Sequence, residues 1–545
     1  MNTRPYIISV LTPALVAALS GAAPTQSRDV EQISPGTRRG AELVESFDGL
    51  GAGLSASPTV RNPSDNSLAV GPDHIMQTVN SQIAVLTKKG QRYDTTGRLL
   101  YGPIATNTVF AGFGGVCEAR PNGDAVVRYD QLAGRWLIVM PIFRRTMFSP
   151  ESRLVNVREP AAPGEAARPG QAAQPGAAAR FGPPPTPPPP GPRGQGGSAA
   201  GQPPDGSYAM CYAVSVGGDP LGAYYRYVFE RPLFPDYPRP AVWPDGYYTP
   251  TSTGDDVIQK HVCAADRASM LKGLPATEQC TIVEGVNFLN TADVDGPNAP
   301  PSGAPNIVMA AGGTQLKGDL DDDKIYAWTF HVDWKHQEKT ALNGPVMIAV
   351  APYHYLCGGQ LTNCVPQPGT DRKLDAQGDK IMPRLVYRRI GSRESIVAVH
   401  SVDTAAGGGG VRWYEFRLDA NRVPKLFQQG TYAPDRFYRW MASPAMDRSG
   451  NIGIGYSFGG TPNFAGQRFT GRLAGDPLGQ LTLAETVLVQ GEASQTTTIR
   501  WEDYTQTAMD PSDDCTIWYV GDYLKSGATA YSTRIGAFRI SGCGK

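Results

Sequence analysis

The chain has 545 residues, of which 63 are glycine and 48 are proline, and its 50 Lys and Arg balance its 50 Asp and Glu. A net charge of zero excludes the strongly basic surface by which proteins bind nucleic acids or anionic membranes. The hydrophobic content of 41% is enough for a large core, so disorder is excluded for most of the chain. The composition therefore indicates a large globular protein rich in turns.

The N-terminal residues have the layout of a secretory signal peptide. Arg4 supplies positive charge, residues 6–19 are apolar, and small residues follow at positions 20–23. The apolar stretch is shorter than the roughly 20 residues of a membrane-spanning helix and contains Pro13. We predict cleavage near Ala23, a flexible tail over residues 24–45, and a secreted protein, periplasmic or extracellular, with no membrane span.

The cysteines support the same compartment. Their number, eight, is even and allows complete pairing in an oxidising environment. Their spacing relative to the histidines matches no zinc site, so we expect no metal cluster. We predict four disulfides by joining neighbours in the sequence, with the last pair assigned by elimination: Cys263–Cys280, Cys357–Cys364, Cys515–Cys543 and Cys117–Cys211.

Residues 157–206 form a tract of proline, alanine and glycine. Such a segment buries too little apolar surface to offset the entropy of ordering its backbone. Strand-like sequence flanks the tract on both sides, so we predict a disordered insertion within a single structural unit over residues 46–545. A linker between two domains is the alternative.

The rest of the chain indicates β structure. Short runs of Val, Ile, Tyr, Trp and Thr alternate with turn residues, and the clearest helix signal is a short one over residues 266–274. Two segments repeat a pattern that begins Arg-Trp, reaches Ala-Met-Asp, turns, and rises through an apolar strand to a tyrosine: residues 439–457 and 500–520. The pattern is typical of a hairpin in which the aspartate caps the turn.

Looser versions of this pattern recur along the chain, with starts near residues 66, 124, 239, 305, 382, 438 and 499. Repeated four-stranded units of this length are typical of β-propeller blades, and ring closure removes exposed sheet edges. The sequence therefore predicts an all-β fold, a seven-bladed β-propeller carrying the disordered insertion. A pair of β-sandwiches is the competing architecture.

Three segments also carry a resemblance: RWMASPAMDRSGNIGIGYS (439–457), TGRLAGDPLG (470–479) and RWEDYTQTAMDPSDDCTIWYVGDYL (500–524). Together they resemble a family of uncharacterised secreted bacterial β-propeller proteins. A more distant similarity is to sialidase-type propellers, which implies a central pocket that carries several arginines. The chain departs from that family, because no segment matches its aspartate box (Ser-x-Asp-x-Gly-x-Thr-Trp) and no Arg-Ile-Pro motif opens the first unit.

Residues at the starts of different blades meet at one mouth of a propeller's channel. Arg384, Arg439 and Arg500 occupy three such starts, and guanidinium groups together at one mouth would bind a carboxylate or another planar anion. The alternative is that each arginine pairs with a neighbouring acid or stacks on a tryptophan.

Further candidates lie at the same starts. Trp243, Tyr247 and Tyr248 place aromatic faces beside the Asp245 carboxylate, an arrangement that suits a sugar ring. The turn-forming sequence Pro-Asp-Gly within this group explains it equally well. Glu502 with Asp503 offers a carboxylate pair for acid–base hydrolysis. The candidate ligand-binding residues besides the arginines are Trp243, Asp245, Tyr247, Tyr248, Trp440, Trp501, Asp503 and Tyr504.

The acidic run with Asp319, Asp321 and Asp323, and the turn 293–296, suggest calcium, which prefers clustered oxygen ligands. A solvated acidic loop is the alternative, and we expect no other cofactor.

Two functions remain open for the predicted propeller. The first is binding of an extracellular ligand, a carbohydrate or a carboxylate-bearing polymer, or of a surface partner, by a monomer. The second is a glycoside hydrolase or polysaccharide lyase that uses the same central site. The fold alone does not choose between them, so enzymatic activity stays undecided at this stage.

Overall fold

The computed structural model describes residues 30–52, 54, 61–146, 157–158, 207–231, 234–252, 259–313, 323–359 and 362–544. Within these ranges the protein is almost entirely β, as the sequence predicts. The predicted signal peptide, most of the insertion and the candidate calcium ligands Asp319 and Asp321 lie outside the described residues. No helix in the described part is long and apolar enough to cross a membrane.

The strands form four-stranded antiparallel units that follow one another along the chain. The first comprises β3 (Ser67–Val70), β4 (His74–Val79), β5 (Gln82–Thr87) and β6 (Leu99–Ala105). The second comprises β7 (Val126–Asp130), β8 (Arg135–Thr146), β10 (Ser207–Ser215) and β11 (Tyr224–Arg231), onto which β9 (Val157–Arg158) pairs. The third comprises β12 (Ala241–Val242), β13 (Gly246–Thr251), β14 (Gln259–Asp266) and β15 (Glu278–Glu284).

The next two units share one nine-stranded sheet, because β16 and β22 pair in parallel. One comprises β16 (Asn290–Asp295), β17 (Asn306–Ala311), β18 (Lys324–His331) and β19 (Ala341–Ala349). The other comprises β22 (Leu385–Ile390), β23 (Arg393–Asp403), β24 (Gly409–Leu418) and β25 (Pro424–Tyr432), with β1 (Glu31–Gln32) added at its edge. Between them lies a hairpin of β20 (Asn363–Gln367) and β21 (Thr370–Asp375).

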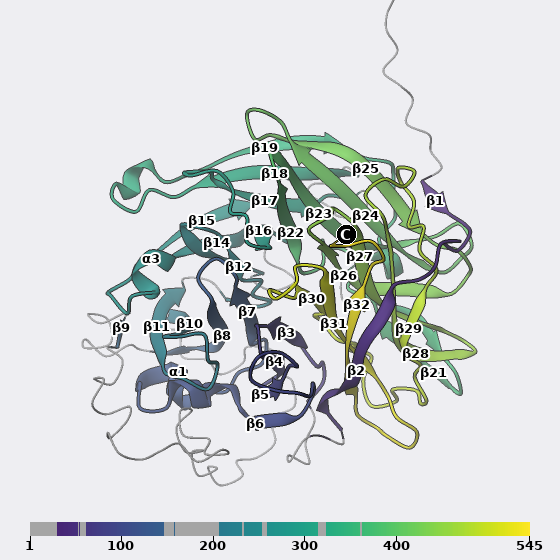
Figure 1. Ribbon diagram of the computed structural model, residues 1–545, viewed down its shortest axis with the longest axis horizontal. Coiled ribbons are helices and arrows are strands. Elements are labelled where there is room, and N and C mark those ends of the chain that lie inside the picture. The colour runs from purple at the N-terminus through teal and green to yellow at the C-terminus, as the bar shows by residue number, and fades with distance from the viewer. Residues whose placement is uncertain are drawn as a thin grey trace, which may run out of the picture.

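The last units complete the ring. One comprises β26 (Tyr438–Met446), β27 (Ile452–Gly460), β28 (Asn463–Arg472) and β29 (Thr486–Val489). The other comprises β30 (Gln506–Met509), β31 (Thr516–Tyr523), β32 (Ser532–Arg539) and β2 (Glu42–Gly51). Figure 1 shows the units side by side around a common centre, where their first strands lie: β3, β7, β12, β16, β22, β26 and β30.

Strand β2 joins the two ends of the chain in one sheet. It pairs antiparallel with β32, and Figure 1 shows the purple β2 beside the yellow β32. Asp48 of β2 accepts hydrogen bonds from Tyr523, Lys525 and Arg534. The prediction of a flexible tail through residue 45 is therefore wrong for β1 and the start of β2, because these residues cover strand edges that would otherwise present unpaired backbone groups.

Two unit starts differ from the sequence prediction. The fourth unit begins at β16, before the predicted start near residue 305, because the polar sequence Asn290–Asp295 lacks the apolar pattern of the other strands. The last strand pattern begins at Gln506 rather than Arg500, since Glu502 and Asp503 adopt positive φ values of 59° and 66° and turn the chain.

Helices are few and short in the described residues. The 3₁₀ helices are η1 (Thr106–Phe110), η2 (Gln337–Lys339) and η3 (Leu356–Gly358), and the α-helices are α1 (Gly115–Ala119) and α3 (Arg267–Met270). Helix α3 confirms the short helix predicted over residues 266–274. Asp266 caps it by accepting a hydrogen bond from the Ser269 backbone N–H.

The predicted hairpin caps are confirmed in both repeats. Asp447 Oδ1 accepts from the backbone N–H groups of Ser449 and Asn451, each within 3.0 Å. Asp510 Oδ1 accepts from the backbone N–H of Ser512 at 2.9 Å. The Ala-Met-Asp motif therefore ends one buried strand and closes the turn to the next.

All four predicted disulfides are confirmed, and all eight cysteines are paired. Cys263–Cys280 joins facing residues of β14 and β15, and Cys515–Cys543 ties the chain after β32 to the start of β31. Such covalent pairing is typical of proteins that fold in an oxidising compartment.

The Cys515–Cys543 bridge gives a direct test of the closed last unit. Replacing Cys543 by Ser should lower the free energy of unfolding by about 2–4 kcal/mol, because the bridge restricts the unfolded chain. Chemical denaturation of the variant and the native protein measures the difference. An unchanged denaturation midpoint would show that the bridge contributes nothing to the last unit.

Candidate functional site

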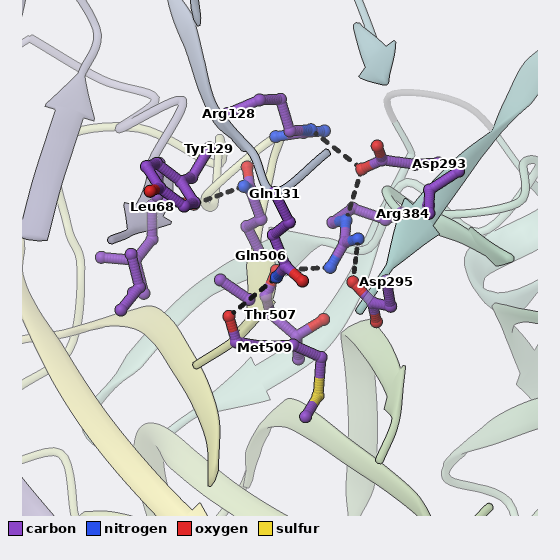
Figure 2. Close-up of a pocket in the computed structure, with 14 residues that line it drawn as sticks. Leu68, Arg128, Tyr129, Gln131, Asp293, Asp295, Arg384, Gln506, Thr507 and Met509 are labelled. Atoms are coloured by element: carbon purple, nitrogen blue, oxygen red, sulfur yellow. Dashed lines mark hydrogen bonds and ion pairs between the residues drawn. The ribbon is translucent and has the colours of Figure 1, made fainter. Parts of the chain in front are cut away.

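A small polar pocket lies at the centre of the ring (Figure 2). Its walls come from the first strands β3, β7, β16 and β30 and from Arg384, just before β22. The space open to water is about 20 Å³, and one water needs on the order of 10–15 Å³. The pocket is therefore too small to hold a sugar.

An ion-pair network fills the space beside this pocket. Arg384 Nε lies 2.6 Å from Asp293 Oδ2, and its guanidinium also pairs with Asp295. Arg128 Nε lies 3.2 Å from the same Asp293 oxygen, and Arg384 Nη1 donates to the Thr507 carbonyl at 3.1 Å. Figure 2 shows both arginines pointing toward the aspartates. Two cations and two carboxylates balance, so this network closes the centre of the ring without a net charge.

The network answers two sequence predictions. Arg384 binds carboxylates of its own chain, which is the alternative interpretation of this residue. Asp293 and Asp295, predicted as a possible calcium turn, bind arginines instead. Burial acts to lower the pKa of Arg384, but the two aspartates outweigh it and raise the pKa above its ordinary value.

Arg439 is also neutralised within the protein. Its side chain is fully buried and pairs with Asp435 at 2.9 Å and Glu485 at 2.7 Å. Arg384, Arg439 and Arg500 share no carboxylate partner among the described residues. A common anion site of the three guanidinium groups therefore does not form: the buried Arg439 cannot contact a ligand.

Most of the predicted aromatic ligands belong to the core. Trp243 donates from Nε1 to the Ala304 carbonyl, and the Trp440 and Trp501 rings lie 6.2 Å apart. Five of these side chains are buried, which excludes stacking on an outside sugar: Trp243, Tyr247, Tyr248, Trp440 and Trp501. Asp245 is half-buried, and the Tyr248 hydroxyl donates to it at 3.2 Å.

Five carboxyl groups lie close together near the centre of the ring, although the three predicted arginines do not. Asp503, Asp65, Asp124 and Asp236 each precede the first strand of a unit, namely β30, β3, β7 and β12. Asp375, at the end of β21, completes the group, which we call the acid cluster. The first strands surround the centre of the ring (Figure 1). The charge interactions among these five acids show that the residues leading into the strands lie close together there.

Asp503 is the common neighbour within the acid cluster. Burial raises the pKa of Asp124 to about 6 and that of Asp375 to about 8, and the Asp503 charge adds to both shifts. Burial raises the pKa of Asp65 and Asp236 well above the ordinary value, with further contributions from Asp124 and then Asp503. At neutral pH most of these carboxyl groups therefore hold a proton or share one.

Asp503 itself is bound by cationic and polar donors. Arg500 pairs with it and lies 3.3 Å from Asp375, and Gln377 Nε2 donates to Asp503 Oδ1 at 3.2 Å. Burial acts to lower the pKa of Arg500, but Asp503 and Asp375 raise it overall. Arg500 is therefore bound to acids, although 32% of its side chain remains exposed.

Two tyrosines connect the acid cluster to its surroundings. The Tyr504 hydroxyl donates to Asp124 Oδ2 at 2.9 Å, and the Tyr237 hydroxyl donates to the Asp503 carbonyl at 2.7 Å. Their rings stack with centroids 4.3 Å apart. Asp124 is half-buried, so it combines a raised pKa with contact to solvent.

Glu502, proposed with Asp503 as a catalytic pair, lies deeper. It is fully buried and accepts hydrogen bonds from Ser457, Gln467 and the Asp522 backbone N–H. Burial and then the Asp522 charge raise its pKa well above the ordinary value. Glu502 thus supports the structure behind the acid cluster and does not form a pair that faces solvent with Asp503.

Sequence reasoning found Asp503, Arg500 and Tyr504 but missed the other four acids. A signal was present, since Asp65 and Asp124 each stand two residues before a first strand. A search for acids just ahead of every expected first strand would have found them. Asp375 carries no such signal, because it reaches the centre through the extra hairpin β20–β21.

The calcium prediction stays open. Of its three residues only Asp323 is described, and its Oδ2 accepts a hydrogen bond from the Tyr353 backbone N–H at 3.1 Å. The described contacts thus show a loop-stabilising role for Asp323.

No known protein family and no curated protein matches the chain. Among solved structures it is similar to a Dyadobacter fermentans protein of unknown function, at 9% identity over 92% of this chain and 100% of that one, with a TM-score of 0.32. It is similar to an ulvan lyase, a polysaccharide lyase, at 9% identity over 90% and 92%, with a TM-score of 0.35. The parainfluenza virus 5 hemagglutinin-neuraminidase ectodomain gives 8% identity over 62% and 76%, with a TM-score of 0.34.

The raised carboxyl pKa values predict how stability depends on pH. Because the folded state binds protons that the unfolded state has lost, unfolding should become easier as pH rises from the ordinary value of 3.8 toward about 8, the pKa of Asp375 and Asp522. Below that window the opposite trend should appear, since Asp48 and Asp435 have lowered pKa values.

Thermal unfolding between pH 6.5 and 8.5 at constant ionic strength checks this prediction. Below pH 6.5 the opposite trend is added by His74 and His261, because burial lowers their pKa values to about 4 and about 3. Asp522→Asn removes one of the raised groups, so its melting temperature should fall less steeply over the same range. A native protein whose melting temperature stays level or rises through the window would contradict the proposed protonation of the acid cluster.

Proposed function

We propose that this protein is an exported β-propeller that binds a carbohydrate at the acid cluster and hydrolyses its glycosidic bonds. The export rests on the signal-peptide pattern and on the four disulfides. The seven four-stranded units, arranged around one centre, support a seven-bladed propeller with residues 157–206 inserted in the second blade.

The observation that carries the proposal is the convergence of acids from separate units, among which Asp124 has a raised pKa and Asp503 is bound by an arginine. A protonated carboxyl beside an ionised one is the arrangement by which glycosidases pair an acid with a base or nucleophile. Here Asp124 has a pKa of about 6, whereas Asp503 is held by Arg500 and Gln377. Groups with strongly perturbed pKa values at a concave centre are typical of catalytic sites.

In this proposal Asp124 gives its proton to the glycosidic oxygen as the bond to the departing sugar breaks. Asp503 stabilises the positive charge that develops on the remaining sugar and accepts a proton from the attacking water. The Tyr504 hydroxyl, which donates to Asp124 Oδ2, orients the proton donor. Water is consumed, Asp503 releases to solvent the proton it accepted, and Asp124 takes one up from solvent, so both carboxyl groups return to their starting states.

The acid cluster favours hydrolysis over elimination. A polysaccharide lyase needs a base that removes a proton from carbon. The phenols hydrogen-bonded to the acid cluster that could serve as this base are those of Tyr237 and Tyr504. Burial raises the pKa of both well above the ordinary tyrosine value, which makes their anions inaccessible near neutral pH.

Binding without hydrolysis is the second candidate. One observation favours it: Asp503 is only 7% exposed and is anchored by two donors, which restricts its approach to a substrate. Under this alternative the half-buried Asp124 and Asp236 would bind sugar hydroxyls as hydrogen-bond partners.

Purified protein assayed for new reducing ends on a panel of polysaccharides tests the proposed hydrolysis. Asp124→Asn should reduce the turnover number about a hundredfold or more while the substrate still binds, because the proton donor is lost. The native rate should fall as pH rises through about 6, where Asp124 loses its proton.

Asp245→Asn is the matched control, since burial raises its pKa to about 6 as well but it lies outside the acid cluster. It should keep native activity. Retention of a polysaccharide without reducing ends at any pH would establish the binding-only alternative, and equal losses in both variants would remove Asp124 from the mechanism.

A further inference from the structure

A buried guanidinium without hydrogen bonds lies next to the acid cluster. Arg239 is 3% exposed, and none of its three guanidinium nitrogens has a hydrogen-bond partner within the described ranges. Burial lowers its pKa to about 10, so it keeps its charge at neutral pH. A buried charge without hydrogen bonds is unfavourable unless another group pairs with it.

A second cation faces the same aromatic rings. The Arg239 guanidinium carbon lies 4.7 Å from the ring centre of Tyr237 and 5.3 Å from that of Phe288. Lys380 Nζ lies 4.0 Å from the Phe288 ring and 5.2 Å from the Tyr237 ring. Ring faces attract cations but accept none of the directional hydrogen bonds that guanidinium N–H groups make.

The nearby acids do not take up the Arg239 donors. Asp379 pairs with Lys380 at 3.1 Å and accepts from Asn287 at 2.8 Å. Asp236 makes no hydrogen bond to the guanidinium, and burial raises its pKa well above the ordinary value, which weakens it as an anionic partner. The positive charge of Arg239 therefore lacks a directional partner within the described chain.

We propose that Arg239 and Lys380 form an oxyanion subsite that takes a carboxylate or sulfate group of the ligand. Such a group complements the planar fork of Arg239 and the point charge of Lys380 in charge and hydrogen-bonding capacity. Lys380 Nζ also donates to Gln377 Oε1, so Arg239 is the main determinant of the subsite. The Tyr237 ring stacks on Tyr504, whose hydroxyl binds Asp124, so the subsite lies one aromatic pair away from the proposed proton donor. The inference rests on the proposed function for the sugar and makes it an acidic one.

Anion binding tests this subsite without any assay of hydrolysis. Sodium sulfate and sodium glucuronate are titrated against the native protein by calorimetry and thermal shift, with sodium chloride at equal ionic strength and glucose as controls. We expect saturable binding of glucuronate or sulfate and none of glucose. Arg239→Gln should weaken it about tenfold or more, because a charge-assisted bidentate contact is lost.

Two more variants make the test specific. Lys380→Gln should weaken binding as well, whereas Arg92→Gln removes a surface arginine that pairs only with Asp219 at 3.0 Å and should leave it unchanged. If Arg239→Gln does not fold, Arg239→Lys keeps the charge, loses the fork, and should show an intermediate affinity.

Equal anion affinity in the native and Arg239 variants, or no saturable binding, would overturn the subsite. Sulfate also stabilises proteins in general, and this effect would be the same in every variant, so it is distinguished from specific binding at the subsite. Hydrolysis of neutral polysaccharides that depends on Asp124, without anion binding, would reject the subsite and leave the proposed function standing. Anion binding that depends on Arg239, without hydrolysis, would support the subsite and reject the proposed hydrolysis.

Discussion

The position of every candidate site residue depends on the closure of the ring by β2 and β32. Strand β2 comes from the start of the chain and forms the outer edge of the unit that contains β30 to β32. The ion pairs and hydrogen bonds of Asp48 fasten it there. With the last unit complete, β30 lies beside β3 at the centre, and Asp503 and Asp65 are brought together although 438 positions separate them in the sequence. Backbone pairing between β2 and β32 at the outer edge of the ring thus determines which acids meet at its centre.

The charged groups at the centre of the ring form two sets, the ion-pair network beside the pocket and the acid cluster. Beside the small pocket, Arg128 and Arg384 balance Asp293 and Asp295, and the result is a neutral plug between first strands. Ahead of the first strands and at the end of β21, five carboxyl groups lie around Arg500, and burial raises the pKa of four of them. The ion pairs neutralise one another, whereas the acid cluster has raised carboxyl pKa values, which the proposed function uses for proton transfer to a ligand. This contrast is why the function is assigned to the acid cluster and not to the pocket.

Local chemistry made much of the fold predictable from the sequence. The four disulfides follow from cysteine spacing, the turns at Asp447 and Asp510 from a repeated motif, and the helix after Asp266 from its cap. Strand β16 was missed because its aspartates point to arginines at the centre, so it lacks the apolar alternation of an ordinary strand. Alternation of apolar and polar residues does not reveal a strand whose side chains pair with charged groups.

The site was less predictable than the fold for a related reason. Arg384 and Arg439 lie at strand starts as predicted, whereas Arg500 lies six residues ahead of β30. Each of the three guanidinium groups nevertheless pairs with a carboxylate of its own chain. Which acids remain after such pairing depends on contacts between units far apart in the sequence. Arg239 illustrates the converse, since its lack of hydrogen bonds is visible only once its neighbours are placed.

Direct titration of the aspartates tests the central claim most plainly. Carbon-13 labelling of the Asp side-chain carboxyl groups, followed by NMR from pH 3 to 9, reports the protonation of each resolved residue. The account predicts two resonances that titrate near 6, one of which disappears in Asp124→Asn and the other in Asp245→Asn. It predicts two more near 8, which disappear in Asp375→Asn and in Asp522→Asn respectively. If every aspartate in the folded protein titrates below about 4.5, close to the ordinary range, the convergence of protonated acids at the centre of the ring is contradicted.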